Sequence, residues 1–329
     1  MLLVADIGAT NARFQLVHDI AEPAGEMITL STKSMNQDVS MLEAAIQELQ
    51  VDPQEIAAAS FAVAGPSKMD NSDIFDESNS ITVTNTGLEV SAKRLSRVLG
   101  CKVALANDFF ALAHGIPYFR SLAPLGEPVA DSASDLQNKI MLGPGSGLGL
   151  ANWIYQPDGQ WLVVPSEAGH MDFAPGNALE AELYGILSRS HQHVSWETVL
   201  SGPGLVHLYA AMCELWGSKA ESYSAAQVSE LGANMSDPVC HQTLESFCAL
   251  LGHAAGNLVL ASLATGGVYI GGGIAKKILP FLESSPFRRR FEERGPMAAV
   301  AKTTPTYVVC DEEPGLVGAT VLLKRRLNG

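Results

Sequence analysis

The 329-residue chain is short of cations, with 21 lysine and arginine residues against 35 aspartate and glutamate residues and a net charge of −14. Such an excess of negative charge repels phosphate backbones and anionic lipid surfaces. We therefore expect no nucleic-acid partner and no membrane partner. An anionic small molecule is not excluded, because a pocket can be locally positive.

Cysteine is also scarce, and long uncharged apolar runs are missing. The five cysteines are scattered and form no C-x-x-C pair, which predicts reduced thiols and argues against a disulfide framework or a zinc site. The sequence has no run of about 18 uncharged apolar residues, and Asp6 interrupts the first apolar run before a signal peptide could form. Together these absences predict a cytoplasmic protein.

What is present is apolar material for two cores, because 47% of the residues are hydrophobic and a domain averages about 150 residues. In the first part, the pattern predicts strands at 2–5, 14–17, 57–64 and 103–106, and helices at 41–49, 92–99 and 109–114. Ser91 is placed to cap the second of these helices, and Gly100 to end it. Strands alternating with helices predict a mixed α/β domain.

The second part is more helical. Helical spacing predicts helices at 247–263 and 316–327, and a short apolar stretch near 268–270 predicts a strand between glycine clusters. Arg288, Arg289 and Arg290 precede Glu292 and Glu293 at helical spacing, which predicts a solvated, ion-paired face.

A strand, a glycine-containing turn and a second strand occur twice, around residues 6–13 and 143–149. Backbone N–H groups beside glycine can approach an anion closely, so both turns are candidate phosphate loops. Neither turn is a P-loop or a dinucleotide fingerprint, because a strand follows each one instead of a helix. Tight hairpin turns without a ligand remain the alternative. The recurrence indicates an internal duplication with a cleft between the halves.

These segments carry a family resemblance. DIGATNAR at 6–13 and GPGSGLG at 143–149 resemble the two phosphate segments of the sugar kinase, Hsp70 and actin superfamily, and GGVYIGGGI at 266–274 resembles its adenosine segment. The chain further resembles the bacterial ATP-dependent glucokinases that lack a zinc signature, through NDF at 107–109, PSEAGHMDFAP at 165–175, VSWETVLSGPGL at 194–205 and PGLVG at 314–318. The related repressor and kinase family with a cysteine-rich zinc motif is disfavoured, because no cysteine lies between Cys101 and Cys213.

The resemblance implies a two-domain actin-like ATPase fold of the α/β class, ribonuclease H-like, with an interdomain cleft. We expect a small domain at 1–115 plus 314–329 and a large domain at 116–313. The resemblance also suggests a homodimer. The implied reaction is ATP-dependent phosphorylation of glucose to glucose 6-phosphate.

Phosphoryl transfer needs a proton acceptor for the attacking hydroxyl. Asp108 follows a predicted buried strand, so it could serve as a general base, but Asn107 and Asp108 could equally cap the next helix. The resemblance favours Asp108 as the base and implies that Asn107 bonds a sugar hydroxyl. It likewise implies that Glu167, His170 and Glu197 contact the sugar, where local sequence alone favours structural or solvated roles.

ATP and Mg²⁺ are the implied cofactors. Mg²⁺ prefers oxygen ligands and keeps several waters, so we expect Asp6 to act on it through water. The resemblance assigns the nucleotide to a set of turn residues: Asp6, Gly8, Thr10, Asn11, Gly145, Ser146, Gly147, Gly272 and Gly273.

The chain departs from the family at a few positions. Ala9 and Ala168 stand where the family usually has glycine, no tryptophan follows Asn85, and the stretch 67–80 is longer and more acidic. If position 9 must take a positive φ or approach a phosphate closely, the Ala9 methyl group is a cost.

Two other functions stay open. The altered region 84–87 leaves room for mannose, glucosamine or an N-acetylhexosamine as the substrate of a kinase of the same fold. A non-catalytic sugar sensor is the other candidate. Repressor relatives carry an added N-terminal helix-turn-helix, for which we expect no room before the first strand.

Overall fold

The structure, a computed structural model, describes residues 1–20, 22–66, 74–127 and 136–328. Its contacts divide the chain into two compact units: unit 1 is Met1–Arg120 with Asp311–Gly329, and unit 2 is Ser121–Cys310. The expected domain bounds, 1–115 with 314–329 and 116–313, fall within a few residues of this division. The longer, more acidic stretch 67–80 lies partly outside the described residues, and Ser80 begins a strand.

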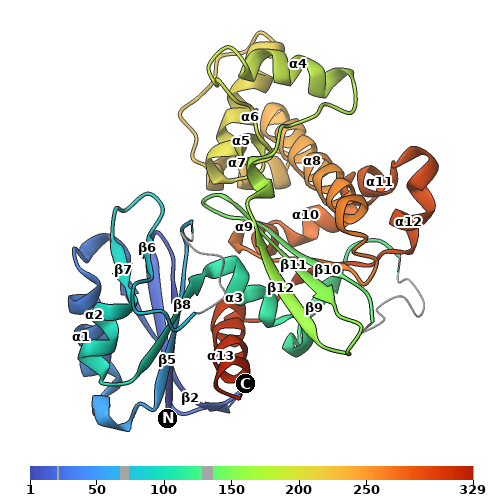
Figure 1. Cartoon of the computed structure of the whole chain (residues 1–329). Helices are drawn as coiled ribbons and strands as arrows, with labels where there is room; N and C mark the ends of the chain where they lie inside the picture. Colours follow the sequence, from blue (N-terminus) through green and yellow to red (C-terminus); the bar gives the residue numbers. More distant parts are fainter. Residues whose placement is uncertain (21, 67–73, 128–135, 329) are drawn as a thin grey trace. The chain divides into compact units, whose positions relative to one another are not determined.

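Unit 1 is built on a twisted sheet in the order β3-β2-β1-β5-β8, with β4 also paired to β2 (Figure 1). The expected hairpin is present, because β1 and β2 are antiparallel, whereas β1, β5 and β8 run parallel. The strands are β1 Leu2–Ile7, β2 Asn11–Asp19, β3 Glu22–Pro23, β4 Ile28–Ser31, β5 Ala58–Val63, β6 Ser80–Thr82, β7 Glu89–Ser91 and β8 Lys102–Asn107; the helices are α1 Asp38–Leu49, α2 Ala92–Leu99, α3 Asp108–His114 and α13 Pro314–Leu327.

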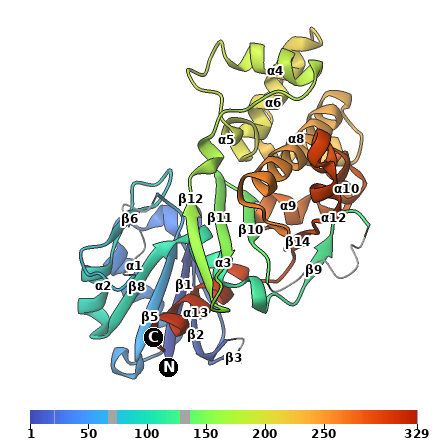
Figure 2. The same ribbon diagram turned by 45° about the vertical axis from the view of Figure 1, so that its right-hand side comes forward.

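Helices cover both faces of this sheet, as Figures 1 and 2 show: α1 and α2 on one side, α3 and α13 on the other. Because side chains alternate along a strand, Phe61 and Leu105 join the apolar core under α1 and α2. The alternate positions, such as Ala62 and Ala104, carry small side chains and are fully buried. Small residues let α3 and α13 approach closely, and a Cβ added at Gly318 of α13 would lie 2.3 Å from the Ala111 carbonyl oxygen.

One expected cap is absent. Ser91 occupies the N-cap of α2, but its side chain makes no capping hydrogen bond there. Gly100 ends the helix in the left-handed conformation at φ 66°, as predicted.

His114, at the end of α3, is buried with 6% of its surface exposed. Its Nδ1–H donates to the Phe110 carbonyl oxygen at 2.8 Å. Burial lowers the pKa of His114 to about 4. The hydrogen bond to Phe110 raises this pKa, whereas the nearby charges of Arg325 and Arg326 lower it further. The side chain is therefore neutral in the folded protein.

This shift predicts a loss of stability in acid. The unfolded chain binds a proton at His114 below pH 6.5, whereas the folded chain does so only near pH 4, so stability falls as pH drops through that window. Between pH 7.5 and pH 5 we expect His114 to remove about 2 kcal/mol from the unfolding free energy. Urea unfolding of His114→Gln should show a correspondingly flatter pH dependence, and His18→Gln, at an exposed position, should keep the wild-type slope.

Unit 2 repeats the strand arrangement of unit 1. Its sheet has the order β12-β11-β10-β13-β14-β9; β10 and β11 form the antiparallel hairpin, and β10, β13 and β14 run parallel. The strands are β9 Leu122–Pro124, β10 Lys139–Pro144, β11 Leu148–Tyr155, β12 Trp161–Ser166, β13 Val268–Ile270 and β14 Thr306–Val309; the helices are α4 Ala178–Leu187, α5 Trp196–Val199, α6 Gly202–Leu215, α7 Ala225–Ala233, α8 Pro238–Ser262, α9 Gly273–Lys277, α10 Leu279–Ser284, α11 Phe287–Glu292 and α12 Ala298–Thr303.

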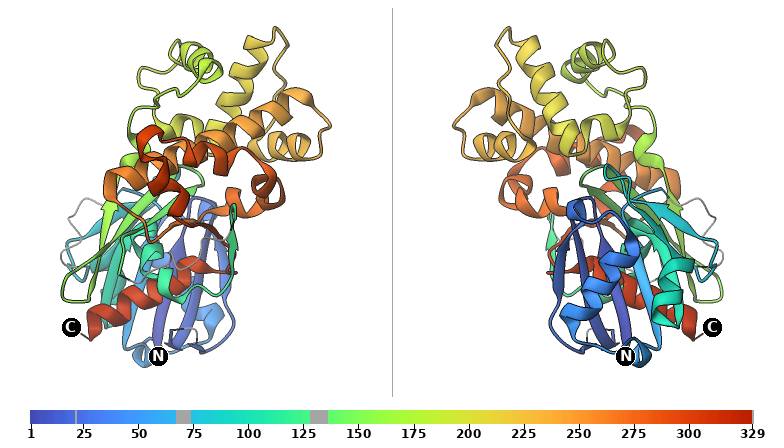
Figure 3. Two further views of the ribbon diagram at one scale, coloured as in Figure 1. Left: turned by 90° about the vertical axis from the view of Figure 1, so that its right-hand side faces the viewer. Right: turned by 90° about the vertical axis from the view of Figure 1, so that its left-hand side faces the viewer.

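The long helix α8 runs through the helical part of unit 2 and packs against α6, α7 and α11 (Figure 3). It begins at Pro238, nine residues before the expected start at Phe247, because Asp237 caps it by accepting from the Val239 and Cys240 N–H groups. By length and composition α8 is the one described helix that could cross a membrane, but 67% of its most apolar window is buried inside unit 2. That burial is typical of a core helix.

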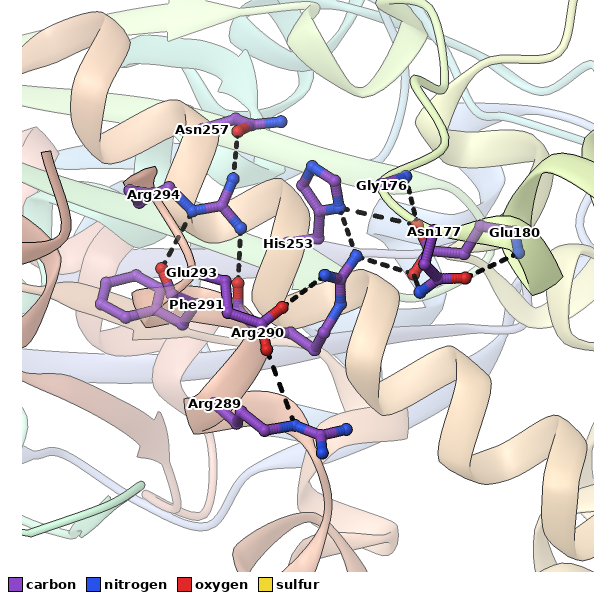
Figure 4. A network of polar contacts seen from close by, with 10 residues as sticks. All are labelled: Gly176, Asn177, Glu180, His253, Asn257, Arg289, Arg290, Phe291, Glu293 and Arg294. Atoms are coloured by element: carbon purple, nitrogen blue, oxygen red, sulfur yellow. Dashed lines mark hydrogen bonds and ion pairs between the residues drawn. The ribbon is translucent and has the colours of Figure 1, made fainter. Parts of the chain in front are cut away.

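A polar network joins α4, α8 and α11 inside unit 2 (Figure 4). The Arg290 guanidinium donates to Glu180 Oε1 at 2.8 Å and to Glu293 Oε2 at 2.6 Å. Burial raises the pKa of Glu180, but hydrogen bonds from His253 and the Gly176 N–H and the charge of Arg290 outweigh it, so the net shift is downward. The arginine run is ion-paired as expected, but Arg290 is 7% exposed, so the prediction of a solvated face is wrong at this position.

Breaking this buried pair should be costly. Arg290→Met leaves the Glu180 carboxylate without its cation, and we expect a loss of about 3–5 kcal/mol in unfolding free energy. The double variant Arg290→Met with Glu180→Met should recover much of that loss, because the buried carboxylate is removed and Glu293, the other partner of Arg290, is 47% exposed. Chemical denaturation measures both. Arg289→Met is the matched control, since the Arg289 side chain is 71% exposed and 3.8 Å from Glu293 and should cost less than about 1 kcal/mol.

Candidate active site

The first glycine-containing turn joins β1 to β2 in unit 1. The Gly8 N–H donates to the Asn11 carbonyl oxygen at 2.9 Å, and the Thr10 carbonyl oxygen accepts from the Thr32 N–H at 3.0 Å. Ala9 does not adopt a left-handed conformation, because the described non-glycine residues with positive φ lie elsewhere, at Gln50, Asn85, Met235 and Leu263. The backbone therefore does not require glycine at position 9.

Asp6 lies near the end of β1, directly before this turn. Its carboxylate Oδ2 is 3.9 Å from Arg13 Nη1, and Arg13 Nε is 3.0 Å from Glu313 Oε2. A Cβ added at Gly315 would lie 2.5 Å from Asp6 Oδ2, so α13 approaches this carboxylate through a glycine. Burial raises the pKa of Asp6, and the Arg13 charge acts against that shift. Sequence reasoning did not find Arg13, Glu313 or Gly315 as neighbours of Asp6.

Asn107 and Asp108 stand where β8 ends and α3 begins. Asn107 Oδ1 accepts from the Phe110 N–H at 3.0 Å and its Nδ2 donates to the Gly65 carbonyl oxygen at 2.9 Å. Asp108 Oδ1 accepts from the Phe109 N–H at 3.0 Å. The capping interpretation is thus confirmed for Asn107. An amide and a carboxylate each keep further hydrogen-bonding capacity, so capping does not exclude a role toward a substrate.

The second glycine-containing turn joins β10 to β11 in unit 2. The Gly145 N–H donates to the Gly147 carbonyl oxygen at 2.7 Å, and the Gly145 carbonyl oxygen accepts from the Gly202 N–H at 2.8 Å. Glu197, on the short helix α5, accepts from the Leu148 N–H at 2.9 Å through Oε2. Glu197 Oε2 lies where a side chain at position 147 would begin, because a Cβ added at Gly147 would lie 2.5 Å from this oxygen.

His170 lies beside Glu197, with Nδ1 at 3.9 Å from Glu197 Oε1. Both side chains reach solvent, at 59% and 33% exposure. The exposed Glu167 precedes the turn of 3₁₀ helix Ala168–His170, and its carbonyl oxygen accepts from the His170 N–H at 2.9 Å. Unit 2 therefore brings His170 and Glu197 together next to the turn that includes Gly147.

The third glycine cluster follows β13. The Gly271 N–H donates to the Leu142 carbonyl oxygen of β10 at 2.8 Å. Gly272 has φ 84°, and a Cβ there would lie 2.6 Å from the Pro144 carbonyl oxygen. Glycine is therefore required at position 272, whereas Gly273 opens α9 with nothing within 4 Å of an added Cβ. This cluster lies against the end of β10, where the second turn begins.

The side chains near the first turn suit Mg²⁺, which keeps several waters, better than a metal whose ligands all come from the protein. No group of three or more histidine, cysteine, aspartate or glutamate side chains that could hold a metal ion occurs among the described residues. Mg²⁺ is usually held by one or two carboxylates together with waters and substrate phosphates. A single carboxylate, that of Asp6, beside a candidate phosphate turn fits that mode.

Comparisons with known proteins agree with one another. The family model described as Glucokinase matches residues 3–326. The chain is 37% identical over 330 residues to the glucokinase of Chromobacterium violaceum, covering 99% of this chain and 90% of that protein. It is similar to a solved glucokinase from an Antarctic psychrotroph, with a TM-score of 0.82 at 32% identity and 98% of each chain covered.

A more distant structure shares the fold alone. This is a ROK family glucokinase from Streptomyces griseus, solved with glucose and AMPPNP, with a TM-score of 0.64 at 18% identity over 98% of this chain and 99% of that one. The neighbours have the actin-like ATPase fold, so the predicted fold class is confirmed.

Proposed function

Because the chain belongs to the glucokinase family, we propose that it transfers the terminal phosphoryl group of ATP to the 6-hydroxyl of glucose. The observation that carries this proposal is the family match over residues 3–326. ATP is a substrate of this reaction, and magnesium is proposed as its metal.

We propose that Asp108 is the general base that accepts the proton of the sugar hydroxyl. Its backbone is fixed at the start of α3 by the Asn107 cap, which holds the carboxylate at the end of a buried strand. A carboxylate placed within hydrogen-bond reach of the sugar hydroxyl can accept its proton as the bond to phosphorus forms. The remaining amide hydrogen of Asn107 would bond a neighbouring sugar hydroxyl.

Three side chains of unit 2 are proposed to bind further sugar hydroxyls: Glu167, His170 and Glu197. A hydroxyl both donates and accepts, so a carboxylate and an imidazole side by side can bind adjacent hydroxyls as a pair. A sugar that lacks a matching hydroxyl leaves one of these groups unpaired, at a cost of about 1–3 kcal/mol. This is the proposed basis of hexose selection.

The turns are proposed to bind the nucleotide. Gly8, Thr10 and Asn11 would supply donors to phosphates from the first turn, Gly145, Ser146 and Gly147 from the second, and Gly272 and Gly273 would lie near the adenosine. Asp6 would hold Mg²⁺ through water, and the ion when bound neutralises phosphate charge during transfer.

A hexose panel tests the substrate. A coupled assay with ATP and Mg²⁺ should give a kcat/KM for glucose at least tenfold above that for mannose, glucosamine and the N-acetylhexosamines. The other sugars are included because the region 84–87 lacks the tryptophan usual in the family. This region turns through Asn85 and Gly87, both in the left-handed conformation. A preference for one of the other sugars would replace glucose with that sugar in the proposal.

Location and assembly are proposed with the function. All five cysteines are free, as suits a reducing cytoplasm, and the family resemblance suggests a homodimer. Light scattering of the purified protein should give about twice the 34.8 kDa mass of the chain. A mass near that of one chain would remove the dimer from the proposal.

A further inference from the structure

We propose that Arg13 is a positioning residue, held by Glu313, that fixes the Asp6 carboxylate for the metal–nucleotide complex. The inference rests on the proposed function, because it concerns the same nucleotide site. It assigns a role to two charged residues from opposite ends of the chain.

The sheet register places Arg13 beside Asp6. The two residues are directly opposite one another on the antiparallel strands β1 and β2, so their side chains project from the same face of the sheet. The resulting ion pair is long, with 3.9 Å between Arg13 Nη1 and Asp6 Oδ2. A contact of that length orients Asp6 only if the guanidinium itself is held in place.

Glu313 holds it. Its Oε2 is 3.0 Å from Arg13 Nε, the guanidinium nitrogen nearest the side-chain stem. A guanidinium is planar, so a bond at Nε also sets the direction of both Nη atoms. Glu313 is the N-cap residue of α13, and the three side chains are only 24–33% exposed, which limits screening by solvent.

Gly315 completes the arrangement. Any Cβ at this position would lie 2.5 Å from Asp6 Oδ2 and 2.8 Å from Asp6 Cγ. Asp6 Oδ2 is therefore enclosed between the guanidinium and the backbone of α13. One oxygen of the carboxylate is then fixed by the protein, and we assign the other to a metal-bound water.

A charge effect and a positioning effect of Arg13 predict opposite changes in metal–nucleotide affinity when Arg13 is removed. If Arg13 only opposed the Asp6 charge, removing it would strengthen the binding of a cation. If it positions Asp6, its loss should weaken metal–nucleotide binding, as the loss of an outer partner of a metal-bound group commonly does by 10–100-fold.

The test is direct binding of Mn²⁺ with ADP, followed by electron paramagnetic resonance on the purified full-length chain. We expect Arg13→Gln to weaken binding by roughly tenfold. Arg13→Lys, which keeps the charge but loses the planar fork, and Glu313→Gln should each weaken it by roughly threefold. Glucose binding followed by tryptophan fluorescence should change less than about twofold in all three, because these residues do not touch the sugar.

Matched controls are Arg97→Gln, an exposed arginine in the last turn of α2, and Glu312→Gln, an exposed carboxylate next to Glu313. Both should bind Mn²⁺ with ADP as the wild type does. Unchanged or tighter binding in Arg13→Gln would overturn the inference while leaving the function in place. A wild type that binds no Mn²⁺ with ADP would overturn both.

Discussion

Asp108→Asn is expected to lower kcat for glucose phosphorylation by about 10²–10⁴-fold, the usual contribution of a general base. The amide oxygen can still accept from the Phe109 N–H, as Asp108 Oδ1 does at 3.0 Å. The start of α3 should therefore persist, and the loss should be in proton transfer. Steady-state kinetics should show KM for both substrates within a few-fold of wild type.

Asp52→Asn is the matched control for this variant. Asp52 also carries a carboxylate that accepts a local backbone hydrogen bond, from the Gln54 N–H at 2.9 Å, but it lies at an exposed turn. We expect wild-type kinetics from it. A kcat within threefold of wild type in Asp108→Asn would show that another group takes the proton.

Gly147→Ala is the second substitution with a large expected effect. The added methyl group would lie 2.5 Å from Glu197 Oε2, so the carboxylate must leave the Leu148 N–H or the turn must move. A displacement of about 1 Å at a reacting site can cost about 10²-fold. We expect kcat/KM to fall by that factor for both glucose and ATP, because Glu197 belongs to the proposed sugar set and the turn to the nucleotide set.

Gly185→Ala controls for the loss of a glycine in the same unit. Gly185 lies within α4 with nothing within 4 Å of an added Cβ, so alanine should leave kinetics unchanged and slightly stabilise the helix. If Gly147→Ala loses affinity for ATP alone, the turn and Glu197, the proposed sugar-binding carboxylate, are not coupled as the geometry indicates.

Local pattern in the sequence was enough to predict the hairpin that starts the sheet in each unit. Apolar runs interrupted by glycine turns predicted both hairpins, and the structure has them as β1–β2 and β10–β11. The position of Asn107 after an apolar strand left a cap on α3 as one of two alternatives, and the structure has that cap. These features depend on neighbours within a few residues, so one segment of sequence contains the information.

Features that depend on distant partners were not predictable. Glu313 lies 300 residues after Arg13, and only the fold brings α13 against β1 and β2. Arg290 is buried because it pairs with Glu180, which lies 110 residues earlier in the chain. The local run with Glu292 and Glu293 is instead typical of an exposed surface. Glu197 was expected to contact the sugar. Its hydrogen bond from the Leu148 N–H could not be predicted, because that contact depends on the position of β11, far from Glu197 in the sequence.

The return of α13 to unit 1 has a consequence for synthesis on the ribosome. Unit 2 is one continuous segment, Ser121–Cys310, whereas unit 1 needs residues from both ends of the chain. Because α13 covers part of the sheet face lined by small residues, the nascent unit 1 lacks that cover until residues 311–329 have been synthesised. Unit 2 can therefore mature first, although its segment emerges second, which reverses the usual N-terminal-first order of co-translational folding.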